Sequence, residues 1–256
     1  MKIARFSVGG GDPRFGIVDD DEIVVLAGDP MFQGFDTLDE RVPLADAKLL
    51  APVIPRSKVV CVGLNYGQHA HDMGDQGPTT PLIFLKPNTA VVGPGDTIQL
   101  PQNVGKIVHE GELVIVIGSV AKRVKAADHA SVIFGYTIGN DVSARDLMVS
   151  DGQWARAKGY DTFAPIGPWI ETELDPSNLE IQTFVDGEPR RHGNTNDMIH
   201  KIPEIIEFVS DVWTLLPGDI IMTGTPAGLG GFTDGQTVDI TIEGIGTLSN
   251  PARDRV

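Results

Sequence analysis

Glu110 and Glu112 stand two residues apart at the start of the apolar run Leu113–Ile117, a spacing that suggests chemistry. Because successive side chains of a strand point to opposite faces, both carboxylates are expected on the same face. Two such charges roughly 5–7 Å apart repel each other, and one pKa rises unless a cation lies between them. An isolated E-x-E pair is also common on the exposed face of an ordinary strand.

A third carboxylate strengthens the case for a metal. Asp141 follows the apolar run Val132–Ile138, and the end of a strand there would bring it beside the two glutamates. Three oxygen ligands with no cysteine nearby suit a hard divalent cation. We therefore expect Glu110, Glu112 and Asp141 to bind Mg²⁺ or Mn²⁺, with Ca²⁺ as a further option.

A candidate general base lies in a region rich in turn residues. His69 and Asp72 are three positions apart, so one helical turn would bring the imidazole within hydrogen-bonding reach of the carboxylate. An aspartate often orients a histidine for proton abstraction, although the same pair is frequent on solvated surfaces. The tract Gly74–Pro81 is rich in glycine and proline, so we interpret Tyr66–Pro81 as a mobile lid.

The overall charge limits the partners. With 20 basic and 35 acidic side chains the formal charge is −15, and such a field repels nucleic acids and anionic membranes. An anionic substrate therefore needs a local positive site. Arg145 and Lys158 are candidates, although such residues in loops are usually solvated. Thr225, in the glycine-rich run Leu215–Gly230, offers a hydroxyl beside backbone N–H groups that could hold a carboxylate.

The chain shows no sign of export. Its N-terminus, MKIARF, lacks the apolar core of a signal peptide, and no apolar run approaches the ~18–20 residues of a membrane span. Cys61 is the single cysteine, which excludes an intrachain disulfide. We expect a cytoplasmic protein.

The elements that must position these residues are mostly strands. The 256 residues include 30 glycines and 18 prolines, and their many short Val/Ile runs favour a turn-rich β architecture. Strands are expected at 2–8, 14–26, 58–64 and 81–85, with an apolar segment at 165–170, a hairpin at 186–187 and a final strand at 238–242 that closes the sheet. Apolar spacing predicts one helix over 202–213. The prolines of 49–55 place a domain boundary near residue 54, between domains 1–53 and 54–256.

Six segments resemble, in order, the successive motifs of the fumarylacetoacetate hydrolase family: VGLNYGQHAHDMG, FLKP, HEGELVIVIG, GYTIGNDVSARD, WARAKGYDTFAPIGPW and LLPGDIIMTGTPAGLG. The resemblance extends over roughly residues 54–251. The resemblance implies an α+β, mostly β fold with rolled mixed β-sheets behind a small N-terminal β domain, and a homodimer. It also implies a divalent-metal site at Glu110, Glu112 and Asp141.

The remaining site residues match the family's positions one by one. The resemblance implies that Arg145, Lys158 and Thr225 contact the substrate and that His69 and Asp72 form a His–acid dyad. Two positions depart from the family pattern. Met148 stands where a glutamine usually hydrogen-bonds the substrate, so its contact is apolar. The dyad acid is Asp72 rather than the glutamate frequent in relatives that hydrolyse acylpyruvates.

The resemblance implies a small anionic keto acid as substrate, in which adjacent carboxylate and ketone oxygens chelate the metal and an enolate is stabilised. We expect the 2-hydroxyhepta-2,4-diene-1,7-dioate isomerase/decarboxylase type, from aromatic catabolism. Oxaloacetate decarboxylation and acylpyruvate hydrolysis are alternatives; in hydrolysis His69 would activate water and Lys158 would stabilise the oxyanion. A rival of another class is a non-catalytic module holding a structural Ca²⁺, which would need neither the dyad nor Arg145 and Lys158.

Overall fold

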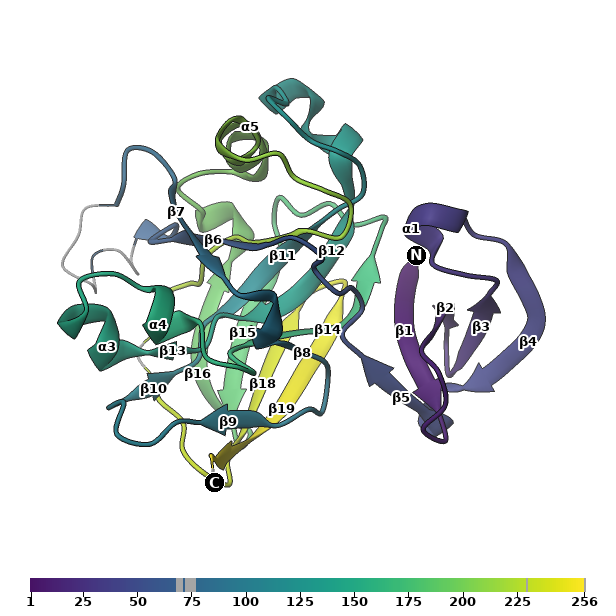
Figure 1. Cartoon of the computed structure of the whole chain (residues 1–256), viewed down its shortest axis with the longest axis horizontal. Coiled ribbons are helices and arrows are strands. Elements are labelled where there is room, and N and C mark those ends of the chain that lie inside the picture. The colour runs from purple at the N-terminus through teal and green to yellow at the C-terminus, as the bar shows by residue number, and fades with distance from the viewer. Residues whose placement is uncertain (68–70, 72–76, 229, 256) are drawn as a thin grey trace.

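Two groups of strands make up the molecule (Figure 1). The computed structural model describes residues 1–67, 71, 77–228 and 230–255. The N-terminal group, purple in Figure 1, stands beside a larger body that holds the rest of the chain. The mostly β architecture with mixed sheets agrees with the prediction.

The N-terminal group is a meander of five strands. They are β1 (Lys2–Val8), β2 (Arg14–Asp19), β3 (Glu22–Leu26), β4 (Thr37–Pro43) and β5 (Ala47–Leu50). Strands β1 to β4 pair antiparallel in sequence order, and β5 pairs with β1. Asp20 adopts φ 54° in the tight turn between β2 and β3, a conformation that Asp tolerates better than most residues.

The meander continues into the sheet of the larger body, because β1 also pairs with β14 (Ala164–Glu171). Beyond β14 the order is β12 (Ile133–Asn140), β11 (Gly111–Ile117), β17 (Ile220–Met222), β6 (Val59–Gly63) and β7 (Leu82–Lys86), while β8 (Val91–Val92) pairs with β14. The sheet is mixed, since β6 and β17 are parallel and β11 is antiparallel to both neighbours. The boundary near residue 54 stays a prediction, because this sheet runs across it.

A second sheet packs against the first. Its order is β16 (Glu188–Asn194), β15 (Glu180–Val185), β18 (Thr237–Ile242), β19 (Gly246–Asp254) and β9 (Ile98–Leu100). The predicted hairpin joins β15 and β16. The prediction that 238–242 closes the sheet is wrong: β18 lies between β15 and β19, because the C-terminal residues add a strand of their own. A short pair, β10 (Ile107–Val108) and β13 (Ser143–Ala144), lies at the edge of the body.

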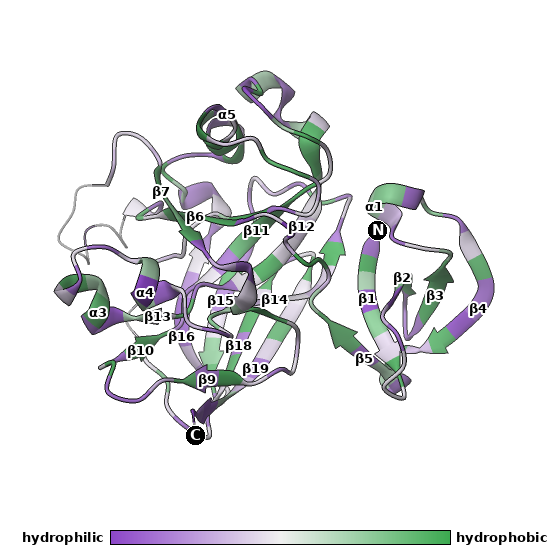
Figure 2. Cartoon of the chain, in the orientation of Figure 1, coloured by the Kyte–Doolittle hydropathy of each residue, from purple (hydrophilic) through white to green (hydrophobic). Residues whose placement is uncertain are grey.

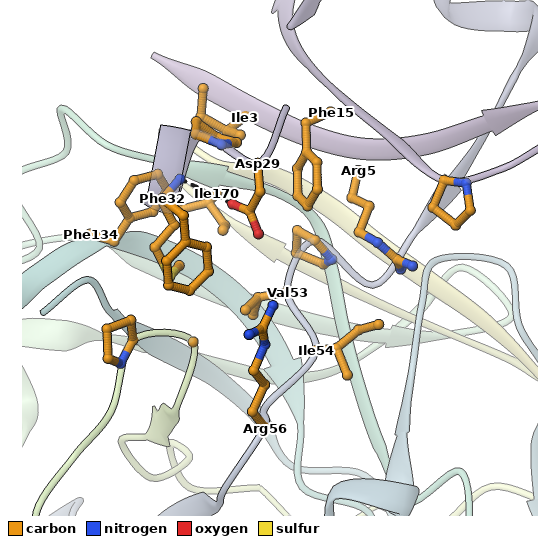
Figure 3. Close-up of a pocket in the computed structure, with 16 residues that line it drawn as sticks. Ile3, Arg5, Phe15, Asp29, Phe32, Val53, Ile54, Arg56, Phe134 and Ile170 are labelled. Atoms are coloured by element: carbon orange, nitrogen blue, oxygen red, sulfur yellow. Dashed lines mark hydrogen bonds between the residues drawn. The ribbon is translucent and has the colours of Figure 1, made fainter. Parts of the chain in front are cut away.

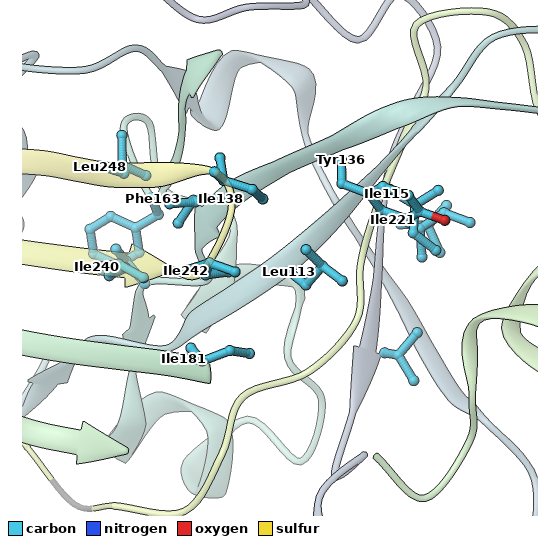
Figure 4. Packing of buried hydrophobic residues seen from close by; sticks show 14 of the residues in the cluster. Leu113, Ile115, Tyr136, Ile138, Phe163, Ile181, Ile221, Ile240, Ile242 and Leu248 are labelled. Carbon is cyan, nitrogen blue, oxygen red and sulfur yellow. The ribbon is translucent and has the colours of Figure 1, made fainter. Parts of the chain in front are cut away.

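Strand β11 is buried on both faces, and this matters for the site. Leu113 and Ile115 pack into the core between the two sheets, with Ile138, Ile181 and Ile240 (Figure 4). The alternate residues of β11 belong to a second apolar cluster, which includes Val114, Val116, Ile3 and Ile170. Hydrophobic residues accordingly dominate β11 and β12, whereas β4 is largely hydrophilic (Figure 2). A polar side chain placed on β11 is therefore removed from water.

Helices are short and peripheral. In the described ranges they are α1 (Pro30–Gln33), α3 (Arg145–Ser150), α4 (Ala155–Lys158) and α5 (Ile202–Val212), with the 3₁₀ turns η1 (Leu44–Asp46), η2 (Asn88–Ala90), η3 (Ala126–Val132) and η4 (Thr195–Asp197). Helix α5 confirms the predicted helix and buries its apolar side chains. Within the described ranges no helix has the length and apolar character that a membrane crossing requires.

Candidate active site

The three predicted carboxylates converge where two paired strands end. Glu110 directly precedes β11, and Asp141 directly follows β12. In the antiparallel register Gly111 faces Asn140, so the start of one strand meets the end of the other. One ligand oxygen from each of Glu110, Glu112 and Asp141 can be chosen so that all lie within 4.8 Å of one another. The predicted same-side projection of the two glutamates is thus present, with Asp141 beside them.

Hydrogen bonds from backbone and side-chain amide groups hold the three carboxylate residues in place. The Asp141 N–H donates to the Glu110 carbonyl at 2.9 Å, and the Glu110 N–H donates to Oδ1 of Asn140 at 2.9 Å. Gly224 donates its N–H to Oε2 of Glu112 at 2.7 Å. Gly224 has φ +99°, and a Cβ there would lie 2.8 Å from Cβ of Asn65, so only glycine fits easily. The carboxylates are therefore positioned by the fold.

Two buried lysines face the carboxylates. Nζ of Lys158 lies 2.8 Å from Oε2 of Glu110, 2.7 Å from Oδ2 of Asp141 and 2.7 Å from Oγ of Ser143. Lys86 donates to the other oxygen of Asp141 and to the Val142 carbonyl. Both lysines are only 2% exposed. A lysine is rarely this deeply buried unless it is paired with an acidic group. Here the carboxylates of Glu110 and Asp141 stabilise the buried ammonium groups.

The pKa values reflect this crowding of charge. Burial raises the pKa of Glu112 well above its usual value, and the charges of Asp141 and Glu110 raise it further. Burial alone would lower the pKa of Lys158, but the charges of Asp141 and Glu110 outweigh it and raise that pKa. Lys158 contacts Glu110 and Asp141, and Lys86 contacts Asp141, whereas Glu112 accepts its hydrogen bond from the neutral Gly224 N–H. A hard cation fits the donor set, because it would relieve the repulsion that Glu112 experiences.

An aromatic wall closes one side of the site. Nζ of Lys158 lies 5.2 Å from the ring centroid of Phe84 and 5.8 Å from that of Trp154, and the two rings pack edge to face. Trp154 also leans on the backbone of Gly63, where a Cβ would lie 2.6 Å from the indole ring. These contacts hold the Lys158 ammonium in a water-poor setting, where its electrostatic effect on a bound substrate is large.

The predicted substrate residues line the same small cavity. Arg145, Met148 and Thr225 contribute to its wall together with the carboxylates and Lys158. Arg145 opens helix α3 directly after β13, and Met148 follows three residues later on the same helix face. Thr225 is buried, and its hydroxyl accepts a hydrogen bond from Nη1 of Arg191 at 3.3 Å. Their roles in binding stay predictions, but the structure brings them to one place.

Two predicted residues lie outside the described part of the chain. His69, Asp72 and half of the predicted lid 66–81 belong to the ranges 68–70 and 72–76, so the dyad stays a prediction. Two residues that take part in the site were not identified from the sequence: Lys86, which forms an ion pair with Asp141, and Ser143, whose hydroxyl accepts a hydrogen bond from Lys158. A lysine at the end of the apolar run LIFLK was the available signal, but its partner Asp141 lies 55 positions away.

Comparison with known proteins agrees with this geometry. Residues 58–253 match the family model described as fumarylacetoacetate (FAA) hydrolase C-terminal, and residues 1–52 match the model Rv2993c-like, N-terminal. The crystal structure of 2-hydroxyhepta-2,4-diene-1,7-dioate isomerase from Mycobacterium marinum superposes with TM-score 0.92 at 49% identity, covering 100% of this chain and 99% of that chain.

Two further relatives carry names that bear on the chemistry. The mitochondrial oxaloacetate tautomerase Fahd2a of Rattus norvegicus is 40% identical over 220 residues, which are 82% of this chain and 70% of the relative. The maleylpyruvate hydrolase of Sphingobium sp. SYK-6, solved in complex with manganese(II) ion and pyruvate, is 34% identical with TM-score 0.84 and full coverage of both chains.

Proposed function

The chain belongs to the fumarylacetoacetate hydrolase family and is an enzyme of its isomerase/decarboxylase-like kind, and from this premise we propose its reaction. The substrate is a dicarboxylic keto or enol acid of the 2-hydroxyhepta-2,4-diene-1,7-dioate type. The enzyme isomerises or decarboxylates it with the help of a divalent cation, Mg²⁺ or Mn²⁺. The enzymatic relatives displace the alternative of a non-catalytic calcium-binding module.

The convergence of three buried carboxylates within 4.8 Å carries this proposal. Glu110, Glu112 and Asp141 would hold the cation through one oxygen each, and their burial would leave its remaining positions for a substrate. When bound, a divalent ion supplies Lewis-acid stabilisation of charge that develops on the oxygens of a keto acid. The manganese and pyruvate in the Sphingobium relative support this class of ligand.

The chain's own residues supply binding and proton control. Arg145 would pair with the distal carboxylate of the substrate, because a guanidinium fork suits a carboxylate. Lys158 would stabilise oxyanion or enolate charge, since its ammonium is already oriented by Ser143 and the aromatic wall. Met148 would pack against the carbon chain beside Arg145. His69, oriented by Asp72, would move the proton in the isomerisation branch.

Oxaloacetate is a second candidate substrate. The rat relative is named for oxaloacetate tautomerisation. Oxaloacetate also carries the adjacent carboxylate and ketone oxygens that a divalent cation chelates. Enolisation or decarboxylation of oxaloacetate would use the same carboxylates and Lys158, while acylpyruvate hydrolysis would additionally require water activation by His69.

A substrate panel tests the proposal. Purified protein would be freed of metal, reloaded with Mg²⁺ or Mn²⁺, and offered the seven-carbon dioate, oxaloacetate and acylpyruvates, with products followed by NMR. We expect turnover only with metal and a higher kcat/KM for the dioate. Preference for oxaloacetate would select the second candidate, and absence of turnover on every compound would refute the proposal.

We infer from the family that the enzyme acts as a homodimer in the cytoplasm. Light scattering coupled to size-exclusion chromatography would measure the mass of the protein in solution. A monomer at micromolar concentration would contradict the inferred homodimer.

A further inference from the structure

A second and larger cavity lies where the N-terminal meander meets the main sheet (Figure 3). Its volume is about 350 Å³, within the roughly 300–1,000 Å³ typical of small-molecule sites. Side chains from β1, β2 and α1 form one wall, residues 52–56 a second, and β12, β14 and the turn at 217–218 the floor. Among the described residues it shares no lining residue with the cavity over Glu112.

The walls of this cavity are largely apolar. Three aromatic rings, Phe15, Phe32 and Phe134, point into it together with Ile170 and Ile54 (Figure 3). Phe32 and Ile54 are 53% and 55% exposed. Exposed apolar side chains gathered around one hollow are typical of a binding site rather than of scattered surface residues. An apolar ligand body, preferably a ring, would bury them.

Two guanidinium groups interrupt the apolar walls. Arg5 on β1 is half-buried, and its Nη1 donates a long hydrogen bond of 3.4 Å to the Ala51 carbonyl. Cζ of Arg56 lies 5.1 Å from the centroid of the Phe32 ring. Within the described ranges neither arginine forms an ion pair within 4.0 Å. By contrast, Arg14 and Arg41 of the same meander both pair with carboxylates.

The charge balance favours one negative charge on the ligand. Burial lowers the pKa of Arg5, and the nearby charge of Asp29 offsets only part of this effect. One carboxylate oxygen of Asp29, Oδ1, already accepts a hydrogen bond from the Met31 N–H at 3.0 Å. Two cations and one anion therefore face the cavity. A monoanion would complete this balance, whereas a dianion such as phosphate would meet Asp29 and leave the phenylalanines uncovered.

We propose that this cavity binds a small organic monocarboxylate with an apolar ring, its carboxylate held by Arg5 and Arg56 and its ring held among Phe15, Phe32 and Phe134. The site is separate from the active site and goes beyond the proposed reaction. Because its walls come from both the meander and the main sheet, a bound acid stabilises their contact by binding only the folded chain.

Calorimetry with phenylacetate on the full-length protein tests this proposal. For a ligand of this size we expect a Kd of roughly 0.1–1 mM, from ordinary ligand efficiency. Phenylacetamide, which keeps the ring but lacks the charge, should bind at least tenfold more weakly. Acetate, which keeps the charge but lacks the ring, should show the same loss. Equal binding of phenylacetate and its amide would overturn the role of the arginines.

Variants locate the site. Arg56→Met removes an exposed guanidinium without opening a core cavity and should weaken phenylacetate at least tenfold, as should Arg5→Met if it folds normally. Arg123→Met, on an exposed arginine of the main body, is the matched control and should leave Kd unchanged. Arg145→Met should also leave it unchanged. Loss of binding in Arg145→Met with retention in Arg56→Met would place the acid in the active site and overturn the proposal, as would no binding by wild type.

Discussion

Nζ of Lys158 lies 2.7 Å from Oδ2 of Asp141, and both groups are almost fully removed from solvent. The same ammonium contacts Glu110, so Lys158 sits among carboxylates that are the proposed metal ligands. A bound cation and this ammonium therefore neutralise the same charges. Metal binding, protein stability and the position of Lys158 should consequently depend on one another.

Lys158→Met tests this dependence. Removal of one partner from a buried ion pair leaves an uncompensated charge, so the metal-free variant should lose about 3–5 kcal/mol of unfolding free energy at neutral pH. Added Mn²⁺ should restore stability more in the variant than in wild type, because it replaces the missing positive charge. Urea unfolding with and without Mn²⁺ measures both effects.

Lys125→Met is the matched control for that experiment. Nζ of Lys125 lies 3.0 Å from Oε1 of Glu207, but both groups are exposed. Such a surface pair contributes only about 0–1 kcal/mol. If both lysine variants lost the same small amount, the charge network around Asp141 would not stabilise the protein as inferred.

Glu112→Ala should abolish both metal binding and turnover. Glu112 is buried beside two other carboxylates, and its pKa is raised by burial and by the charges of Asp141 and Glu110. Truncation would remove one oxygen ligand, so the metal site would lose affinity. It would also remove a carboxyl group that is unfavourably buried beside two others, so the metal-free protein should keep its stability. Titration calorimetry with Mg²⁺ and Mn²⁺ measures the effect, with the exposed Glu188→Ala as control. Unchanged affinity in Glu112→Ala would remove this residue from the metal site.

Local sequence patterns were enough for the strands that carry the carboxylates. The apolar runs beside Glu112 and Asp141 correctly predicted β11 and β12, because strands buried on both faces are continuously hydrophobic. The apolar runs also led to the prediction that Asp141 lies beside the two glutamates, but spacing alone could not show that the two strands pair directly with Gly111 opposite Asn140. The strand alternation around 238–242 was found, but its place within the second sheet depends on β19, which lies later in the chain.

Long-range contacts account for what the sequence could not show. Lys86 at the end of β7 contacts Asp141 after β12, although β11, β17 and β6 lie between these two strands in the sheet order. The cavity between the meander and the main sheet combines Arg5, Arg56 and Phe134, which no local pattern connects. Both features depend on how distant strands meet, and strand pairing of this kind leaves little trace in local composition.

Asp219 should give the protein a defined acid sensitivity. Burial would raise the pKa of Asp219, but hydrogen bonds from the Lys58 ammonium, the Leu216 N–H and Ser57 lower it overall. A carboxyl whose folded pKa is depressed contributes stability above its unfolded pKa, and that contribution is lost as pH falls through the folded pKa. The window therefore begins near the ordinary aspartate value of about 3.9 and extends below it.

Asp219→Asn measures this contribution. At neutral pH the variant should lose about 3 kcal/mol, because it leaves the partly buried Lys58 without its counter-charge. The difference from wild type should begin to shrink near pH 4, where the Asp219 carboxyl of the unfolded wild-type chain takes up a proton, and should shrink further until pH falls below the lower folded pKa. Asp211→Asn, in an exposed pair with Arg123, is the control. A difference that stayed constant from pH 7 to pH 3 would contradict this assignment.

Met148 should influence which keto acid the enzyme prefers. It is half-buried on α3 and lines the cavity beside Arg145, so its thioether faces the region where the substrate's carbon chain would lie. Met148→Gln replaces this apolar contact with an amide that donates and accepts hydrogen bonds. The change should favour acids with an additional oxygen near Arg145 and shift the ratio of kcat/KM between the dioate and oxaloacetate by about tenfold, the effect of one hydrogen bond.

Val149→Gln is the matched control on the same helix, because Val149 is 82% exposed. Since Gln at position 148 could also disturb packing, thermal unfolding of both variants should accompany the kinetics. A changed ratio with normal stability would identify Met148 as a specificity residue, whereas equal ratios in wild type and both variants would leave it as packing alone.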